Sequence, residues 1–189
     1  MQTISPTYQT FWRRFWAGAI DGVVFFPIFL VNRWVWSHVS SVAVLGFWHV
    51  LNASLWLVYS VIGHAVWGQT VGKRVTGVKV MQLSGDPLGL KRALLRDAAS
   101  WVIAIVNVAG DFPKVMVGIN PAHIKDRGTV GQILVWGAMA WFVLELATML
   151  LNDKRRAVHD LIAGAVVVRV GPAVTEPAAR REAAVTVRP

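Results

Sequence analysis

Two acidic side chains lie within stretches that are otherwise apolar. Asp21 lies six residues after Phe15, and Glu145 lies six residues before Leu151. If those residues mark the ends of two helices, a rise of 1.5 Å per residue places both carboxylates about 9 Å below the same edge of a bilayer. An ionised carboxylate in hydrocarbon costs at least about 2.5 kcal/mol, so each acid must find a partner or a proton.

The residues alone leave two explanations of Asp21 open. Arg14 lies two helical turns before Asp21 on the same face, so the two can form a buried ion pair that orients the first apolar segment. Alternatively, Asp21 and Glu145 bind a cation or a proton, and Arg14 competes with the cation as counter-charge. Ser60 and His64 reach a similar depth and complete this possible ion or proton site, although His64 is also explained as an interior histidine that only forms hydrogen bonds.

The composition predicts a membrane protein. Of the 189 residues, 55% are hydrophobic and only 15% are charged, and the mean hydropathy is +0.51. These values are too apolar for an ordinary soluble domain of this length. Ten tryptophans fit the same class, because indole rings gather at the boundary between lipid and water. The chain has no cysteine, which excludes disulfides, thiolate zinc sites and cysteine nucleophiles.

Four apolar stretches approach the length of about 20 residues that a helix needs to cross the hydrocarbon layer. They are residues 15–31, 42–67, 98–119 and 129–151. The third gives the weakest signal, because Asp111, Pro113 and Lys114 interrupt its far end. We therefore expect an all-α membrane protein, a bundle of four transmembrane helices with short cytoplasmic β segments and an amphipathic interfacial helix.

The basic residues predict the orientation of the chain. Most of the 19 lysines and arginines precede the first span, lie in the linker 68–97 or follow Leu151. By the positive-inside rule, both termini and the linker are expected to face the cytoplasm. The basic side chains expected at the anionic inner leaflet, where they bind lipid or only fix the topology, are Lys73, Arg74, Lys91, Arg92, Arg96, Lys154, Arg155 and Arg156. The positive net charge alone does not indicate nucleic acid, and we expect none as a partner.

The linker is predicted to contain three different local structures. Residues 75–83 indicate a strand, residues 84–87 a turn and residues 88–97 an amphipathic helix. A second β-branched run, AGAVVV, follows the last span, and we expect the two runs to pair as a small ribbon.

The residues after the last span contain a candidate structural contact. His159 and Asp160 follow a basic cluster, where they can form a helix cap that pairs with the neighbouring cations, or a latch to the linker strand. Residues 1–170 are thus expected to form one domain. Residues 171–189, rich in proline, alanine and arginine, are expected to be disordered.

Four pieces of the sequence resemble the RDD family of bacterial membrane proteins. FWRRFWAGAID begins the first span, GQTVGKRVTGVKV and LKRALLRD lie in the linker, and DKRRAVHDLIAGAVVV follows the last span. The family is named for an arginine and two aspartates, which correspond here to Arg14, Asp21 and Asp160. Ala165 stands where the family pattern leads us to expect threonine. The resemblance implies a polytopic membrane domain, with cation and proton exchange suggested for some members.

Two functions follow as expectations. The first is cation/proton exchange through buried carboxylates in a homo-oligomer, because four spans are few to enclose a pathway alone. The second is a non-catalytic accessory or assembly subunit of a larger membrane complex, which the small-residue face of Gly18 and Gly22 suits. We expect no enzyme activity, no cofactor and no metal site, because the spacing of the polar residues matches no nucleophile–base pair and no ligand cluster.

Overall fold

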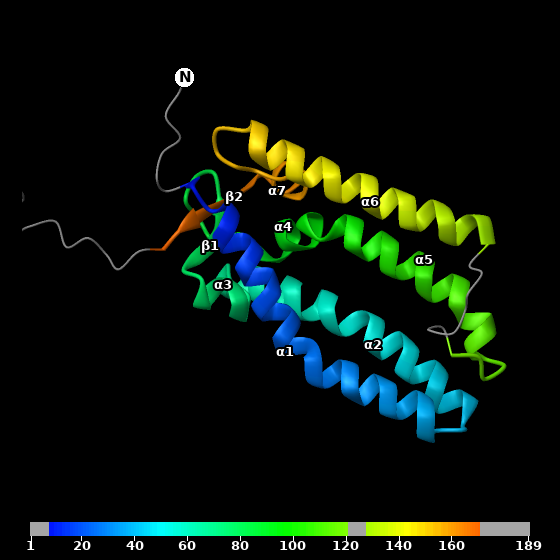
Figure 1. Ribbon diagram of the computed structural model, residues 1–189. Coiled ribbons are helices and arrows are strands. Elements are labelled where there is room, and N and C mark those ends of the chain that lie inside the picture. Colours follow the sequence, from blue (N-terminus) through cyan, green and yellow to red (C-terminus); the bar gives the residue numbers. More distant parts are fainter. Residues whose placement is uncertain (1–7, 121–127, 171–189) are drawn as a thin grey trace, which may run out of the picture.

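Figure 1 shows a computed structural model of the chain, in which residues 8–120 and 128–170 are described. The longest helices are α1 (Phe11–His38), α2 (Val42–Ile62), α5 (Ala98–Val115) and α6 (Gly128–Leu151). The short elements are the π-helix η2 (Gly63–Trp67), α3 (Val71–Val75), β1 (Val78–Gln82), α4 (Gly89–Arg96), α7 (Val158–Ile162) and β2 (Ala165–Arg169). They gather at one end of the long helices, which we call the strand end (Figure 1). The predicted disordered tail, residues 171–189, lies outside the described residues.

Three stretches of helix are long and apolar enough to cross a membrane. They are Phe11–His38, Val42–Trp67 and Gly131–Leu151. A fourth exists only if α4 and α5, which meet at 59°, count together as one bent span. The described chain is therefore mostly helical, with three to four candidate spans where the sequence predicted four.

The ends of two helices differ from the predicted spans. α1 is longer than residues 15–31 at both ends, because the flanking tryptophan-rich turns continue the helix. α5 ends at Val115 rather than near Ile119. Gly118 adopts a φ of 80° just beyond it, a left-handed conformation that terminates helices.

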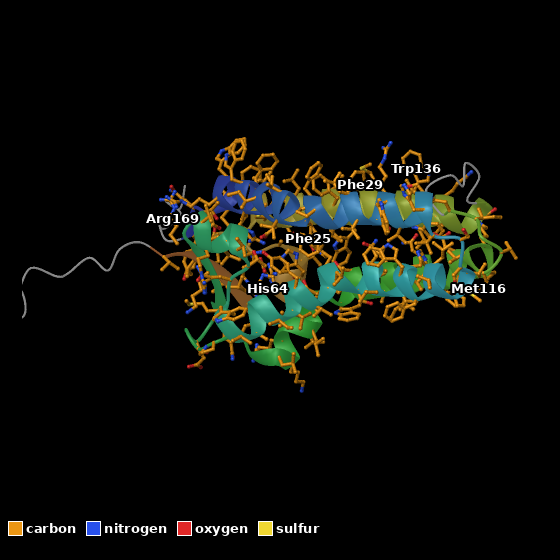
Figure 2. The ribbon with its side chains drawn as sticks, turned by 90° about the horizontal axis from the view of Figure 1, so that it is seen from below. Phe25, Phe29, His64, Met116, Trp136 and Arg169 are labelled. Carbon is orange, nitrogen blue, oxygen red and sulfur yellow. The ribbon has the colours of Figure 1, made fainter. Side chains whose placement is uncertain are left out.

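The outer surface of the long helices is apolar. Figure 2 shows Phe29 and Trp136 on the outside of the bundle, whereas His64 lies inside it. Trp136 is 72% exposed and His64 only 1%. α6 is the extreme case, because none of the most apolar stretch of this helix is buried within the described chain. In water such a surface would be unfavourable, and in lipid it is the surface expected of a span.

The two strands pair, as the sequence predicted, and they run antiparallel with Val78 opposite Arg169. An isolated pair of strands is only marginally stable. Here the inner faces are covered, because Val80 and Val167 are buried in one cluster with Leu88 of the linker and Val61 of α2. The ribbon is therefore held by the helices that surround it.

The predicted strand began too early. It was expected from residue 75, but β1 begins at Val78. Val75 is instead the last residue of α3, a helix that starts where the Thr70 hydroxyl accepts the backbone N–H of Lys73 as a cap. Gly77, with φ 65°, then turns the chain into β1 at Val78.

The predicted amphipathic helix is present as α4, but its basic face is not turned wholly to the outside. Ala93 and Arg96 are buried, and Arg92 donates to the Ala163 carbonyl oxygen at 3.1 Å. α4 is thus packed against α7 and the end of α2, and Arg96 belongs to the protein interior rather than to the membrane surface.

α1 and α3 approach so closely that only glycine fits at residue 72. A Cβ on Gly72 would overlap the carbonyl oxygen of Ala17 and lie 2.9 Å from Cγ of Asp21. The predicted small-residue face of Gly18 and Gly22 has no such close contact, because a Cβ on either glycine meets no atom within 4 Å. Within the described chain, it is therefore Gly72 that allows α3 to pack closely against α1.

The substitution Gly72→Ala is expected to destabilise the fold by about 1–3 kcal/mol, because α3 must move away from α1. Gly22→Ala is the matched control and is expected to leave stability unchanged or slightly improved, since the helix gains propensity and meets open space. Thermal unfolding of the purified protein in detergent, followed by circular dichroism, measures both. Equal melting of Gly72→Ala and the wild type would contradict this account of the α1–α3 contact.

Candidate functional site, a polar cavity among buried charges

Asp21 is 2% exposed and is held by three neutral donors. The Tyr59 hydroxyl donates to Oδ1 at 2.6 Å, and the Gly72 backbone N–H donates to the same oxygen at 2.7 Å. The Thr70 hydroxyl donates to Oδ2 at 2.7 Å. These donors belong to α2 and to the start of α3, so the carboxylate ties α1 to both.

Both partners that the sequence suggested for Asp21 were wrong. Arg14 forms its ion pair with Asp160, and Glu145 forms its pair with His159. Hydroxyl and backbone N–H groups also stabilise a buried carboxylate. Spacing along one helix does not reveal such donors, because here they come from a turn about fifty residues away.

Asp160 is fully buried and joins α1, α4 and α7. Its Oδ2 accepts from Nη2 of Arg14 at 2.7 Å, and its Oδ1 accepts from Nε of Arg96 at 3.0 Å. Oδ2 also accepts the backbone N–H of Ala157 at 3.2 Å, so Asp160 forms the predicted cap at the start of its own helix, α7. Burial by itself would raise the pKa of Asp160, but Arg14, His159 and Arg96 outweigh it and hold the pKa well below its usual range.

His159 links this centre to α6. Its Nδ1 lies 2.7 Å from Oε2 of Glu145, and its backbone N–H donates to Oε1 at 3.1 Å. Its Nε2 lies 2.8 Å from Nη2 of Arg96. A guanidinium only donates hydrogen bonds, so Nε2 must accept and the proton of a neutral ring must be on Nδ1, facing Glu145.

His64 and Ser60 belong to the same interior. The Ser60 hydroxyl and Nδ1 of His64 are 3.3 Å apart, and Nη1 of Arg96 lies 3.1 Å from Nε2 of His64. Arg96 therefore stands between His64 and Asp160 and contacts both. The sequence analysis predicted His64 and Ser60 at the level of Asp21, and both lie near it. It missed Arg96, which it assigned to the membrane surface.

A cavity of about 270 Å³ lies among these groups at the strand end. Side chains from all four long helices line it, together with residues of η2, α3, α4 and α7: Arg14, Gly18, Asp21, Trp56, Ser60, His64, Lys73, Arg96, Asp97, Ala99, Ser100, Trp141 and His159. Of the predicted ion or proton site, Asp21, Ser60 and His64 line the cavity, whereas Glu145 does not. Within residues 8–120 and 128–170, no group of three or more His, Cys, Asp or Glu side chains is arranged to hold a metal ion.

Lys73 differs from the other cations of the cavity. Arg14 and Arg96 are both paired with Asp160, but the Lys73 amino group has no hydrogen bond or ion pair to any residue that the structure describes. Burial lowers the pKa of Lys73, and the charges of Arg96 and Arg14 lower it further, to about 7, against the opposing effect of Asp21 and Asp160. The surroundings of Lys73 thus disfavour its protonated form compared with an exposed lysine.

The remaining basic residues predicted at the inner leaflet divide into two groups. Three have exposed side chains: Arg74, Lys91 and Lys154. Three bind main-chain carbonyl oxygens of the protein: Arg92 that of Ala163, Arg155 that of Leu150 and Arg156 those of Ala165 and Asp160. The predicted pairing of Asp160 with Lys154, Arg155 and Arg156 is replaced by its pairs with Arg14 and Arg96.

The substitution Asp160→Asn is expected to destabilise the fold by about 3–5 kcal/mol at pH 7, because two buried guanidinium groups lose their counter-charge. The low pKa of Asp160 means that its ionised form stabilises the fold above about pH 4, and that this contribution is lost as the pH falls through the folded-state pKa. The difference between variant and wild type should therefore shrink in acid. Melting curves at pH 7 and pH 3.5 measure it, with the exposed Asp86→Asn as control, expected to change little. A variant as stable as the wild type at pH 7 would refute the role of Asp160.

Residues 8–164 match the family model described as the RDD family. No curated protein and no solved structure matches the chain. The matched range covers most of the chain and contains Arg14, Asp21 and Asp160. The chain therefore belongs to the RDD family, and with its long apolar helices it is an integral membrane protein.

Proposed function

We propose that this protein exchanges a small cation for a proton at the polar cavity, with Lys73 as the group that carries the proton beside Asp21. One observation carries the proposal: Lys73 and Asp21 line the same cavity, and the Lys73 amino group has no partner among the described residues. Glu145, which the sequence analysis placed in this role, does not line the cavity and is paired with His159.

The charges around Asp21 explain how a cation and a proton compete. A carboxylate has about four acceptor positions, and neutral donors fill three of those on Asp21. The negative charge remains, while Arg14 and Arg96 are held by Asp160. Protonated Lys73 compensates Asp21, and deprotonated Lys73 leaves that charge available to a cation. The two states therefore exclude one another by charge.

The pKa of Lys73 supports the same mechanism. A lysine at its ordinary pKa of about 10.4 stays protonated at neutral pH. With a pKa of about 7, Lys73 exchanges its proton in that range. The pKa of Lys73 is lowered because burial and two fixed guanidinium groups disfavour a third positive charge.

The orientation is also part of the proposal. The strand end carries both described ends of the chain, because Nε of Arg169 donates to the carbonyl oxygen of Gln9 at 3.0 Å. Two ends on one side require an even number of spans, which favours counting α4 and α5 as one. With the basic residues gathered there, we infer that the protein crosses the bacterial inner membrane four times and that its strand end is cytoplasmic.

A second candidate function rests on α6. This helix exposes large apolar side chains along its length, among them Ile133, Met139 and Phe142. Its main contacts within the described chain are with α7, at its end. Such a helix suits a homo-oligomer, or an accessory subunit whose α6 docks on a larger membrane complex.

Exchange is testable with the full chain in proteoliposomes that contain a pH-sensitive dye. An imposed sodium or potassium gradient is expected to move protons in the wild type, with half-maximal rate near pH 7, where Lys73 titrates. Lys73→Arg should reduce the flux to background, because arginine keeps the charge but does not release its proton. Lys91→Gln, which removes an exposed charge of the linker, is the matched control and should retain the flux.

Two results would overturn the proposal. One is a Lys73→Arg variant with unchanged flux, and the other is a folded wild type, monodisperse on gel filtration, that moves no protons under any gradient. A silent wild type that co-purifies in a fixed ratio with another membrane protein would favour the accessory subunit instead.

A further inference from the structure

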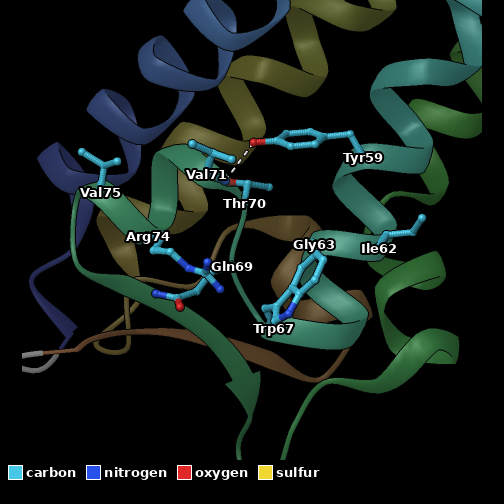
Figure 3. Close-up of a pocket in the computed structure, with 9 residues that line it drawn as sticks. All are labelled: Tyr59, Ile62, Gly63, Trp67, Gln69, Thr70, Val71, Arg74 and Val75. Carbon is cyan, nitrogen blue, oxygen red and sulfur yellow. Dashed lines mark hydrogen bonds between the residues drawn. The ribbon is translucent and has the colours of Figure 1, made fainter.

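We propose that a second pocket, between the end of α2 and α3, binds one anionic phospholipid. Its volume is about 470 Å³. Nine residues line it, as Figure 3 shows: Tyr59, Ile62, Gly63, Trp67, Gln69, Thr70, Val71, Arg74 and Val75. The pocket is separate from the polar cavity, and this proposal does not depend on the function proposed for that cavity.

The walls of this pocket are apolar and uncovered. Ile62 and Trp67 belong to the end of α2 and to η2, and Val71 and Val75 belong to α3. Ile62 is 45% exposed and Val75 is 68% exposed, and the other two lie between these values. No described part of the chain covers them, so a hydrocarbon chain reaches the pocket from the side.

The shape of the pocket is fixed by hydrogen bonds rather than by mobile side chains. The Tyr59 hydroxyl accepts the backbone N–H of Val71 at 2.8 Å, which joins the two walls (Figure 3). The same hydroxyl donates to the buried Asp21, which fixes the tyrosine ring. The Gln69 amide donates to the carbonyl oxygen of Val78 at 2.9 Å and so fixes the floor beside Arg74. A preformed pocket loses little entropy when a ligand enters.

The charge of the pocket selects the headgroup. Arg74 is the charged residue among the nine that line it, and its guanidinium has no hydrogen bond or ion pair to any described residue. Figure 3 shows Arg74 and Gln69 close together at one end of the pocket. A free guanidinium binds a phosphate oxygen pair with two parallel hydrogen bonds. With no acid in the lining, an anionic ligand is favoured.

The position of the pocket identifies its occupant as a lipid. The apolar walls begin on the last turns of a candidate span that ends at Trp67, and Arg74 lies beyond that end. A ligand that fills the site must have hydrocarbon on the membrane side and a negative group on the strand end. An anionic phospholipid has both, whereas free phosphate leaves the apolar walls bare and a zwitterionic lipid presents a cation beside Arg74.

Native mass spectrometry of the full chain in detergent tests the site, with dioleoylphosphatidylglycerol and dioleoylphosphatidylcholine titrated separately. The wild type is expected to bind one phosphatidylglycerol more tightly than phosphatidylcholine. Arg74→Gln should weaken the phosphatidylglycerol adduct about tenfold and leave the phosphatidylcholine adduct unchanged, as expected for one charge-assisted contact. Val75→Asn should weaken both adducts, because it places a polar group in the acyl-chain wall. Lys91→Gln, an exposed charge outside the pocket, should change neither.

The proposal is overturned if Arg74→Gln keeps the wild-type preference for phosphatidylglycerol. It is also overturned if Lys91→Gln weakens the adduct as much as Arg74→Gln, since the preference would then reflect general surface charge. Gel filtration shows whether each variant is folded. Because this assay measures no proton flux, its outcome is independent of the exchange experiment.

Discussion

The fold depends on one buried carboxylate that holds two arginines. Asp160 accepts hydrogen bonds from Arg14 of α1 and from Arg96 of α4. Each of these charges would be costly if buried alone, and together they are compensated. The contact brings helices from both halves of the chain to one point, and the cavity, Lys73 and the β ribbon all lie around it. A buried ion pair of this kind adds little net stability compared with an apolar core, so its main effect is to specify which helices meet.

The cavity next to this centre has an uneven distribution of charge. Two arginines are neutralised by Asp160, while Asp21 is satisfied by neutral donors and Lys73 is left without a partner. An acid and a base thus share a small volume without forming an ion pair with each other. This arrangement differs from a closed structural ion pair, in which neither group is available to a proton or an ion.

Most of the architecture was predictable from the sequence, because it follows from patterns that are local. Long apolar runs gave the helices and β-branched runs gave the ribbon. The errors occurred where a long-range contact decided the outcome. Val75 was predicted to begin a strand, but the Thr70 cap and the contact of Gly72 with α1 place it at the end of the helix α3. Within the site, the distance of each residue from the end of its apolar stretch correctly predicted that Asp21, Ser60 and His64 lie together. It failed for Arg96 and Lys73, because a basic residue near a membrane edge has the same local pattern whether it faces lipid headgroups or turns inward.

The pairing of β1 with β2 has a consequence for biogenesis. The two strands are separated by the whole second half of the helical domain, so β1 has no partner until the ribosome has synthesised the chain through Arg169. Asp160 likewise arrives long after Arg14 and Arg96. The early helices must therefore enter the bilayer with two arginines still hydrated, and the last twenty residues of the domain close the structure. A nascent chain that has not reached that point lacks both contacts, so its helices are not yet joined to one another there.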